Sequence, residues 1–172
     1  MQFFRCIRAV ALALCLPLAA PALAEGSLAQ PAGEPILTVS GAIEAKNSGD
    51  TATFDLAMLE AMTPVTIETS TIWTDGVQSF TGVSLKDLLE HLGASGTMLA
   101  ASALNDYTVE IPVSDAVEGG PILAYAMNGK ALSVRDKGPL WVIYPYDAKS
   151  EYQTEVIYSR SIWQLAKIEV RP

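Results

Sequence analysis

Both cysteines of this 172-residue chain, Cys6 and Cys15, lie near its N-terminus, in a segment that begins with arginines and continues as an apolar run. Ala22-Leu23-Ala24 follows as a small-x-small cleavage pattern, so we predict a signal peptide over residues 1–24 and a periplasmic mature protein. The mature domain then has no disulfide, no thiolate nucleophile and no cysteine ligand for a metal. It has to fold around apolar side chains alone.

The rest of the chain has the length of one domain. Residues 25–35 are rich in Ala, Pro and Gly without periodicity, so we expect a flexible leader there and a single domain over residues 36–172. This mature part carries nine basic and nineteen acidic side chains. The acidic balance argues against nucleic acid as a partner, because phosphate binding needs basic patches.

Strand-type patterns outnumber helical ones along the domain. Helical spacing of apolar residues occurs after Asp55, through Met62, and after Ser84, where four leucines follow a capping serine. We therefore predict an α+β fold, mixed but mainly β, with a few short helices. The expected strands are residues 36–40, 65–73, 77–83, 97–104, 107–111, 122–127, 140–144 and 162–170.

Residue patterns for common catalytic sites are missing. The single histidine, His91, falls within the leucine-rich helix and is interpreted as a surface or boundary residue. The sequence contains no Gly-x-Ser-x-Gly elbow, P-loop or dinucleotide glycine fingerprint.

Aromatic residues instead gather next to polar ones. Trp73 lies between Thr71 and Asp75, Tyr107 follows Asn105-Asp106, and residues 158–163 alternate Tyr or Trp with Ser and Arg. Such neighbours suit a flat heteroaromatic ligand, whose ring stacks while polar groups contact its edge. The alternative for these rings, and for Trp141, is packing in the core.

Four segments resemble, in order, the sulfite-oxidase-type molybdopterin-binding oxidoreductase domain family. The resemblance extends over about residues 36–170 and implies the mixed α+β fold of that domain. The segments are Phe80-Thr81-Gly82-Val83-Ser84-Leu85, Asn105-Asp106-Tyr107-Thr108, Leu123-Ala124-Tyr125-Ala126-Met127-Asn128-Gly129, and Trp163 with Ile168-Glu169-Val170.

The family's molybdenum-ligating cysteine has no counterpart here. Thr69 or Ser70 stands at its position, and a hydroxyl is neither deprotonated near neutral pH nor a soft ligand. Lys137 replaces the histidine that follows the family's Asn-Gly hairpin. The chain is therefore similar to small cysteine-less members, which bind pterins in the periplasm and report to a membrane-bound cyclic-di-GMP enzyme or another sensor.

This resemblance implies a non-catalytic sensor with a pterin as ligand and no tightly bound cofactor, molybdopterin included. Trp73 is the expected stacking ring, and Asp106 the expected acceptor for the amino and N–H edge of the pterin. The other expected contacts are hydroxyls, a cation for a polar tail and a second indole, from Ser70, Thr71, Tyr107, Arg160 and Trp141. Two alternatives stay open: a molybdopterin-dependent oxidoreductase with a non-thiolate site, and a structural partner subunit without ligand.

Overall fold

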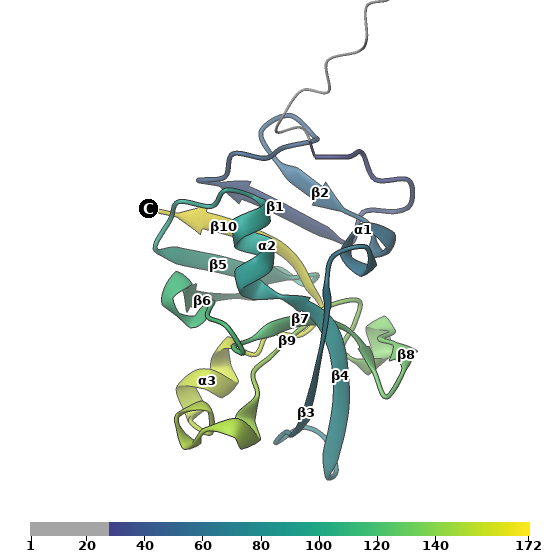
Figure 1. The fold of residues 1–172 in the computed structure, drawn as a ribbon, viewed down its shortest axis with the longest axis vertical. Coiled ribbons are helices and arrows are strands. Elements are labelled where there is room, and N and C mark those ends of the chain that lie inside the picture. The colour runs from purple at the N-terminus through teal and green to yellow at the C-terminus, as the bar shows by residue number, and fades with distance from the viewer. Residues whose placement is uncertain (1–27) are drawn as a thin grey trace, which may run out of the picture.

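The computed structural model describes residues 28–172, so the predicted signal peptide lies outside the described residues. A five-stranded sheet in the order β2-β1-β10-β5-β6 forms one layer (Figure 1). Strands β1 and β10 pair in parallel, and the other neighbours are antiparallel. The strands are β1 (Leu37–Gly41), β2 (Ala52–Phe54), β5 (Met98–Ala103), β6 (Thr108–Pro112) and β10 (Leu165–Arg171).

The second sheet has the order β3-β4-β7-β8, with β9 also paired to β7. Its long β3–β4 hairpin extends away from the first sheet, toward the bottom of Figure 1. Asn128 and Gly129 both have positive φ angles, 51° and 73°, as the predicted hairpin turn requires. The strands are β3 (Pro64–Ser70), β4 (Val77–Ser84), β7 (Ile122–Met127), β8 (Lys130–Ala131) and β9 (Trp141–Ile143).

The helices are short: α1 (Leu56–Glu60), α2 (Leu85–His91) and α3 (Glu155–Arg160). Four 3-10 turns accompany them, η1 (Val113–Asp115), η2 (Val134–Asp136), η3 (Tyr146–Ala148) and η4 (Ser150–Tyr152). The Ser84 hydroxyl accepts a hydrogen bond from the Asp87 amide at 3.3 Å, which confirms the predicted cap of α2. Within residues 28–172, no helix is long and apolar enough to cross a membrane.

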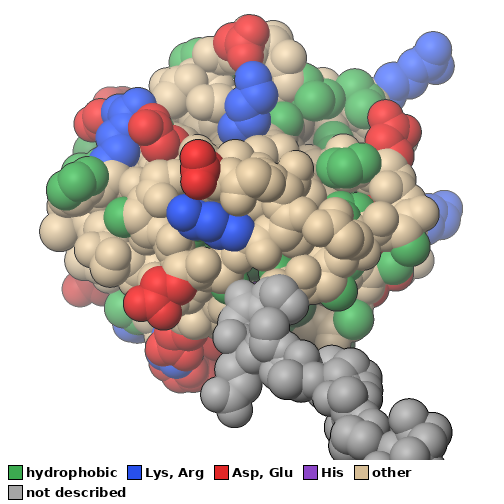
Figure 2. All heavy atoms as spheres, turned by 90° about the horizontal axis from the view of Figure 1, so that it is seen from above, with side chains coloured by type: hydrophobic (Ala, Val, Ile, Leu, Met, Phe, Trp, Pro, Cys, Tyr) green, Lys and Arg blue, Asp and Glu red, His purple; other side chains and the backbone are tan. Residues whose placement is uncertain are grey.

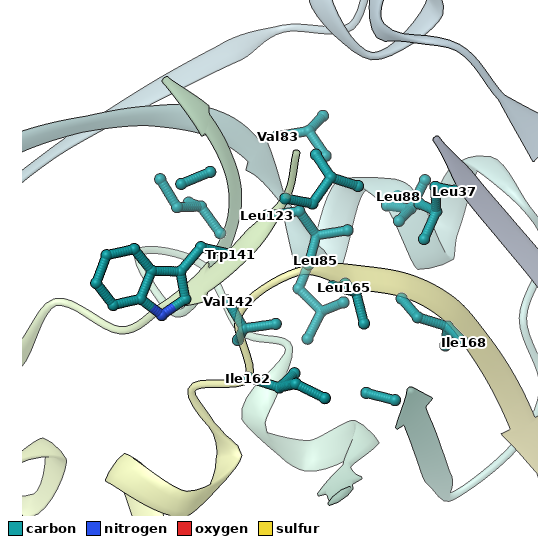
Figure 3. Packing of buried hydrophobic residues seen from close by; sticks show 14 of the residues in the cluster. Leu37, Val83, Leu85, Leu88, Leu123, Trp141, Val142, Ile162, Leu165 and Ile168 are labelled. Atoms are coloured by element: carbon teal, nitrogen blue, oxygen red, sulfur yellow. The ribbon is translucent and has the colours of Figure 1, made fainter. Parts of the chain in front are cut away.

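One hydrophobic core connects both sheets and α2 (Figure 3). Leu85 from α2, Leu123 from β7 and Leu165 from β10 are all buried in it. Backbone contacts also join the layers, because the Val142 amide of β9 donates to the Ile162 carbonyl, just before β10, at 2.9 Å. The core therefore belongs to a single α+β domain, as predicted.

Charges are dispersed over the face shown in Figure 2, where basic side chains lie apart from one another and close to acidic ones. Among the described residues, Arg171 contacts Glu169 at 2.7 Å and Glu110 at 3.7 Å. The basic side chains on this face form no continuous patch.

Three local structures differ from the sequence-based expectations. Strand β3 ends at Ser70 rather than Trp73, because a turn follows. Strand β10 begins at Leu165 rather than Ile162, because Gln164 has a φ of 51°, which a strand does not accommodate. No element was expected over residues 155–160, where Val156, Ile157 and Tyr158 have low helix propensity. The structure forms α3 there, with the Thr154 side chain capping its start through the Ile157 amide.

The predicted flexible leader is attached to the domain over part of its length. Asp55 Oδ2 accepts from the amides of Ala32 and Gly33 at 2.8 and 2.7 Å, while Oδ1 caps α1 through the Met58 amide. These amides lower the pKa of Asp55, with the Gly33 amide as the largest cause. One carboxylate thus holds both the segment before β1 and the start of α1.

Replacing Asp55 with Asn should remove an acid-dependent part of the stability. Because the pKa of Asp55 is lowered in the folded state, its contribution is complete above the ordinary value of 3.8. It is lost as the pH falls through the folded-state pKa. We expect Asp55→Asn to lower the melting temperature at pH 7, and the difference from wild type to shrink progressively as the pH falls below 3.8. A difference that stays constant across this range would contradict the assignment.

Candidate ligand-binding site

A cavity of about 460 Å³ opens between segments that lie far apart in the sequence. This volume is within the range of small-molecule sites. Trp73 reaches it from the β3–β4 loop, the β5–β6 turn forms one side, and the segment after α3 forms the other. The lining residues are Trp73, Ala103, Asn105, Tyr107, Tyr158, Ser159, Ser161, Ile162 and Trp163.

Trp73 is the centre of an aromatic cluster at this cavity. Its ring makes edge-to-face contacts with four others, at centroid distances of 5.7 Å to Trp141, 6.4 Å to Tyr146, 5.8 Å to Tyr158 and 5.9 Å to Trp163. Edge-to-face geometry is favoured by the ring quadrupoles. The cluster therefore fixes the orientation of the Trp73 ring, although Trp73 lies in a loop.

Ser161 anchors the wall that follows α3. Its hydroxyl accepts from the Tyr146 hydroxyl at 2.7 Å and donates to the Ile157 carbonyl at 2.8 Å. Its own carbonyl accepts from Trp141 Nε1 at 3.1 Å. Burial raises the pKa of Tyr146 to about 12, so this phenol stays neutral and keeps its donor proton.

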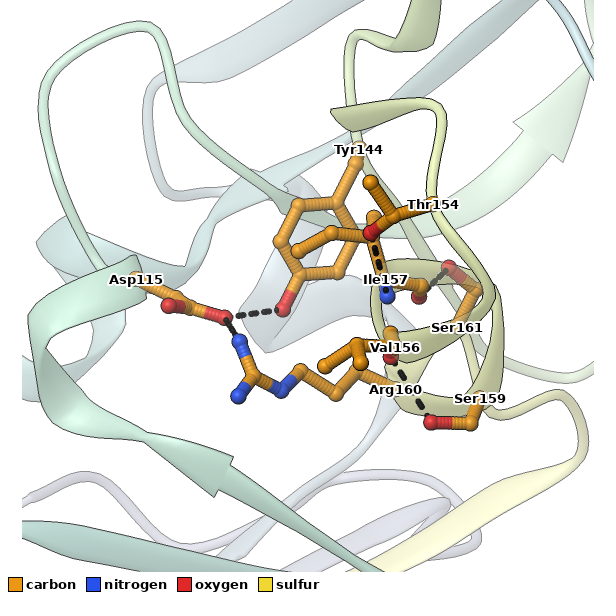
Figure 4. A network of polar contacts seen from close by, with 8 residues as sticks. All are labelled: Asp115, Tyr144, Thr154, Val156, Ile157, Ser159, Arg160 and Ser161. Atoms are coloured by element: carbon orange, nitrogen blue, oxygen red, sulfur yellow. Dashed lines mark hydrogen bonds and ion pairs between the residues drawn. The ribbon is translucent and has the colours of Figure 1, made fainter. Parts of the chain in front are cut away.

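A second network holds the other side of α3 (Figure 4). Asp115 Oδ2 accepts from Arg160 Nη1 at 2.9 Å and from the Tyr144 hydroxyl at 2.7 Å. Burial, with the hydrogen bond to Asp115, raises the pKa of Tyr144 well above its usual value. Arg160 thus ties α3 to η1, and Tyr144 ties the same carboxylate to the end of β9.

The end of β3 is bound to η3 through Asp147. The Asp147 carboxylate accepts from the Ser70 amide at 2.6 Å and from the Ser70 hydroxyl at 2.7 Å. These two bonds, the amide bond being the larger cause, lower the pKa of Asp147 below its usual value. In return the Asp147 amide donates to the buried Thr69 hydroxyl at 3.1 Å.

These contacts bear on whether a molybdenum cofactor would fit. The resemblance puts the metal-ligating cysteine at Thr69 or Ser70, and both hydroxyls are engaged in hydrogen bonds with Asp147. Hydroxyl and carboxylate oxygens are hard donors, unlike the thiolate of the family site. No group of three or more His, Cys, Asp or Glu side chains that could hold a metal occurs within residues 28–172. The donor set at this position does not fit a thiolate-ligated metal.

The structure brings two of the seven sequence-predicted site residues, Trp73 and Tyr107, to the lining of the cavity. Trp141 is buried behind Trp73, as its alternative interpretation expected. Asp106 lies outside the lining, 84% exposed, and its carboxylate contacts Lys167 Nζ at 3.3 Å. Its neighbour Asn105 lines the cavity instead.

The remaining three predicted residues are engaged in contacts within the protein. Ser70 binds Asp147, and Arg160 binds Asp115. The Thr71 hydroxyl lies 2.7 Å from that of Thr74 and accepts from the Trp73 amide at 3.0 Å. Their roles toward a ligand stay predictions.

Trp163 and Tyr158 were not among the predicted site residues, although both line the cavity. Trp163 is 40% exposed rather than buried, so core packing was the wrong interpretation for this ring. The alternation of aromatic and polar residues over 158–163 was the available signal. From this segment only Arg160, its one charged residue, is among the residues predicted for the site.

A second hollow of about 610 Å³ lies beside α1 and α2. Met58, Met62 and Leu28 give it an apolar lining, with Asp87 and His91 from α2. It has one aromatic ring, that of Phe54, in its lining and lacks the cluster found around Trp73. The smaller cavity is therefore the better candidate for a flat ligand.

Comparisons with known proteins agree with the fold. The family profile described as oxidoreductase molybdopterin binding domain matches residues 38–150. The chain is similar to the crystal structure of the sulfane dehydrogenase SoxCD from Paracoccus pantotrophus, with a TM-score of 0.58 and 18% identity. The match covers 78% of this chain but 37% of that one, and at this identity it shows the fold alone. No curated protein matches the chain.

Replacing Ser161 with Ala tests whether this residue anchors the cavity wall. The substitution removes the acceptor of a buried phenol, that of Tyr146, so we expect a loss of about 1–3 kcal/mol in the free energy of unfolding. Denaturant titration measures this loss. The matched control is Ser159→Ala, because the exposed Ser159 hydroxyl bonds the Val156 carbonyl alone. Equal stability of the two variants would show that Ser161 is not an anchor.

Proposed function

This chain belongs to the oxidoreductase molybdopterin-binding domain family, and from that premise we propose that it is a non-catalytic periplasmic protein that binds a pterin-type ligand. The aromatic cavity around Trp73 is the proposed site. The resemblance to cysteine-less members supports a sensor that reports ligand binding to a membrane partner, such as the periplasmic domain of a cyclic-di-GMP enzyme.

The observation that carries the proposal is the exposure of aromatic rings at the cavity. Trp163 and Tyr107 are 40% and 58% exposed, while Trp141 and Tyr146 behind them are buried. Exposed aromatic faces next to a pre-formed hollow favour a flat ligand, because stacking removes apolar surface from water on both partners.

Polar groups at the rim suit the edge of a heterocycle. The Asn105 side chain offers both a donor and an acceptor, and Ser159 adds a hydroxyl. The Asn105 Oδ1 atom also accepts from the Tyr107 amide at 3.2 Å, so its amide nitrogen faces away from that bond. We propose Asn105, next to the Asp106 that was expected to accept from the pterin edge, as an edge contact.

Calorimetry with a reduced pterin tests the proposal. We expect binding to wild type and a loss of about 5- to 150-fold in affinity for Trp73→Ala, since stacking contributes roughly 1–3 kcal/mol per base in other proteins. Trp163→Ala should weaken binding with a smaller loss of packing than Trp73→Ala, because Trp163 makes one of the four edge-to-face pairs of Trp73.

The control for these variants is Leu104→Ala, which shortens an exposed apolar side chain next to Asn105 outside the lining. Its affinity should equal that of wild type. No binding of pterins to wild type, or unchanged affinity in both tryptophan variants, would refute the proposed site.

The oxidoreductase alternative is favoured by family membership itself. Elemental analysis of natively purified protein separates the two functions. We expect no molybdenum, because hydroxyls already bonded to Asp147 stand where the family has a thiolate. Stoichiometric molybdenum would support the enzyme and refute the sensor.

A further inference from the structure

The loop that carries Trp73 has an attachment that the proposed function does not explain. We propose that Asp147 is a positioning residue for the aromatic cavity: its carboxylate fixes the end of β3 and thereby the orientation of the Trp73 loop. The proposal rests on the proposed function only where pterin affinity is measured. The position of the Trp73 loop can be measured without any ligand.

Asp147 makes three hydrogen bonds to two consecutive residues of β3. Each carboxylate oxygen accepts one donor of Ser70, the amide and the hydroxyl, and the Asp147 amide donates to Thr69. Thr69 is fully buried, and β3 packs against η3 at this point. The contact joins residues 77 or 78 positions apart, so it is a tertiary constraint and not a local turn.

The geometry of the loop makes this attachment important. Strand β3 ends at Ser70, residues 71–76 form the turn, and β4 begins at Val77, the pairing partner of Ser70. The strand β4 is held separately, because the Asn128 side chain binds Gln78 Oε1 and the Ser79 amide. Among the side-chain hydrogen bonds of the described residues, those of Asp147 are the ones that hold β3 at this end of the hairpin.

Trp73 lies three residues beyond this attachment. Inside the loop, the Thr71 hydroxyl accepts from the Trp73 amide, which transmits the position of the strand end to the indole. The ring then needs a fixed backbone to meet four aromatic partners edge to face. Releasing Ser70 should therefore move Trp73, while the buried Trp141 loses this one ring contact and keeps its packing against Phe80.

The charged carboxylate of Asp147 is needed because it accepts hydrogen bonds through both oxygens. Ser70 presents two donors, and a carboxylate accepts both, whereas an amide accepts one and turns an N–H₂ group toward the other. The effect should therefore be graded. Asp147→Ala removes both carboxylate bonds and keeps the backbone bond from the Asp147 amide to Thr69. Asp147→Asn removes one of the two carboxylate bonds, and Ser70→Ala removes the hydroxyl bond but leaves the Ser70 amide bond in place.

The experiment uses the three tryptophans of the chain, all within the described domain, as separate reporters. With 5-fluorotryptophan incorporated, each gives one ¹⁹F resonance, assigned by single Trp→Phe variants. We expect the Trp73 resonance to shift or broaden in Asp147→Ala, and less so in Asp147→Asn and Ser70→Ala. The Trp141 resonance should change less than that of Trp73 in each variant, because Trp141 is buried and also packs against Phe80. The control, Glu90→Ala, removes a carboxylate bound to Lys86 on α2 and should change none.

An unchanged Trp73 resonance in Asp147→Ala would overturn the proposal, even if the melting temperature falls, because a merely structural role lowers stability without moving Trp73. If Asp147→Ala does not fold, Asp147→Asn and Ser70→Ala decide by the same criterion.

The ligand arm measures affinity for the same reduced pterin. We expect Asp147→Ala to bind about tenfold more weakly, which is part of the stacking contribution. Equal affinity in wild type and Asp147→Ala would overturn the positioning role toward ligand. Failure of wild type to bind any pterin would refute the proposed function, and the ¹⁹F readout would still decide whether Asp147 positions Trp73.

Discussion

The candidate site depends on the packing of one indole against four other rings. Trp73 comes from the β3–β4 loop. Its four partners are Trp141 from β9, Tyr146 from η3, Tyr158 from α3 and Trp163 from the segment before β10. Each edge-to-face pair contributes about 0.5–1.5 kcal/mol beyond the area it buries. The cluster therefore both joins separate parts of the chain and forms the floor of the cavity. A ligand in this cavity would contact Trp73, Tyr158 and Trp163, which also hold these segments together. Ligand binding would therefore act directly on the packing between the segments.

The sequence predicts most of the scaffold because its signals are local. The Ser84 cap and the Asn128-Gly129 turn depend on residues within a few positions of one another, and each is present as expected. The cavity wall does not follow from such signals. Helix α3 is held by an ion pair between Arg160 and Asp115, 45 residues apart in the sequence, and nothing near α3 indicates that contact.

The choice of Asp106 as the edge contact has the same limit. The Asn105-Asp106-Tyr107 segment is correctly aligned with a turn, but Asp106 has a φ of 63° and its carboxylate contacts Lys167, outside the lining. A motif fixes the position of a residue in the chain. The side chain that reaches the cavity depends on the turn, and here it is Asn105.

By the resemblance, hydroxyl side chains stand at the end of β3 where the family has a metal-ligating cysteine. A thiolate at the end of β3 would be a strong ligand for a soft metal, whereas Ser70 and Thr69 are donors and acceptors that need partners once buried or half-buried. Asp147 supplies these partners, so that the strand end is fixed by hydrogen bonds to η3. The end of β3 then holds the Trp73 loop in position. A cavity lined by aromatic rings does not need a metal to keep its shape, because the shape depends on ring packing and on the attachment of one loop.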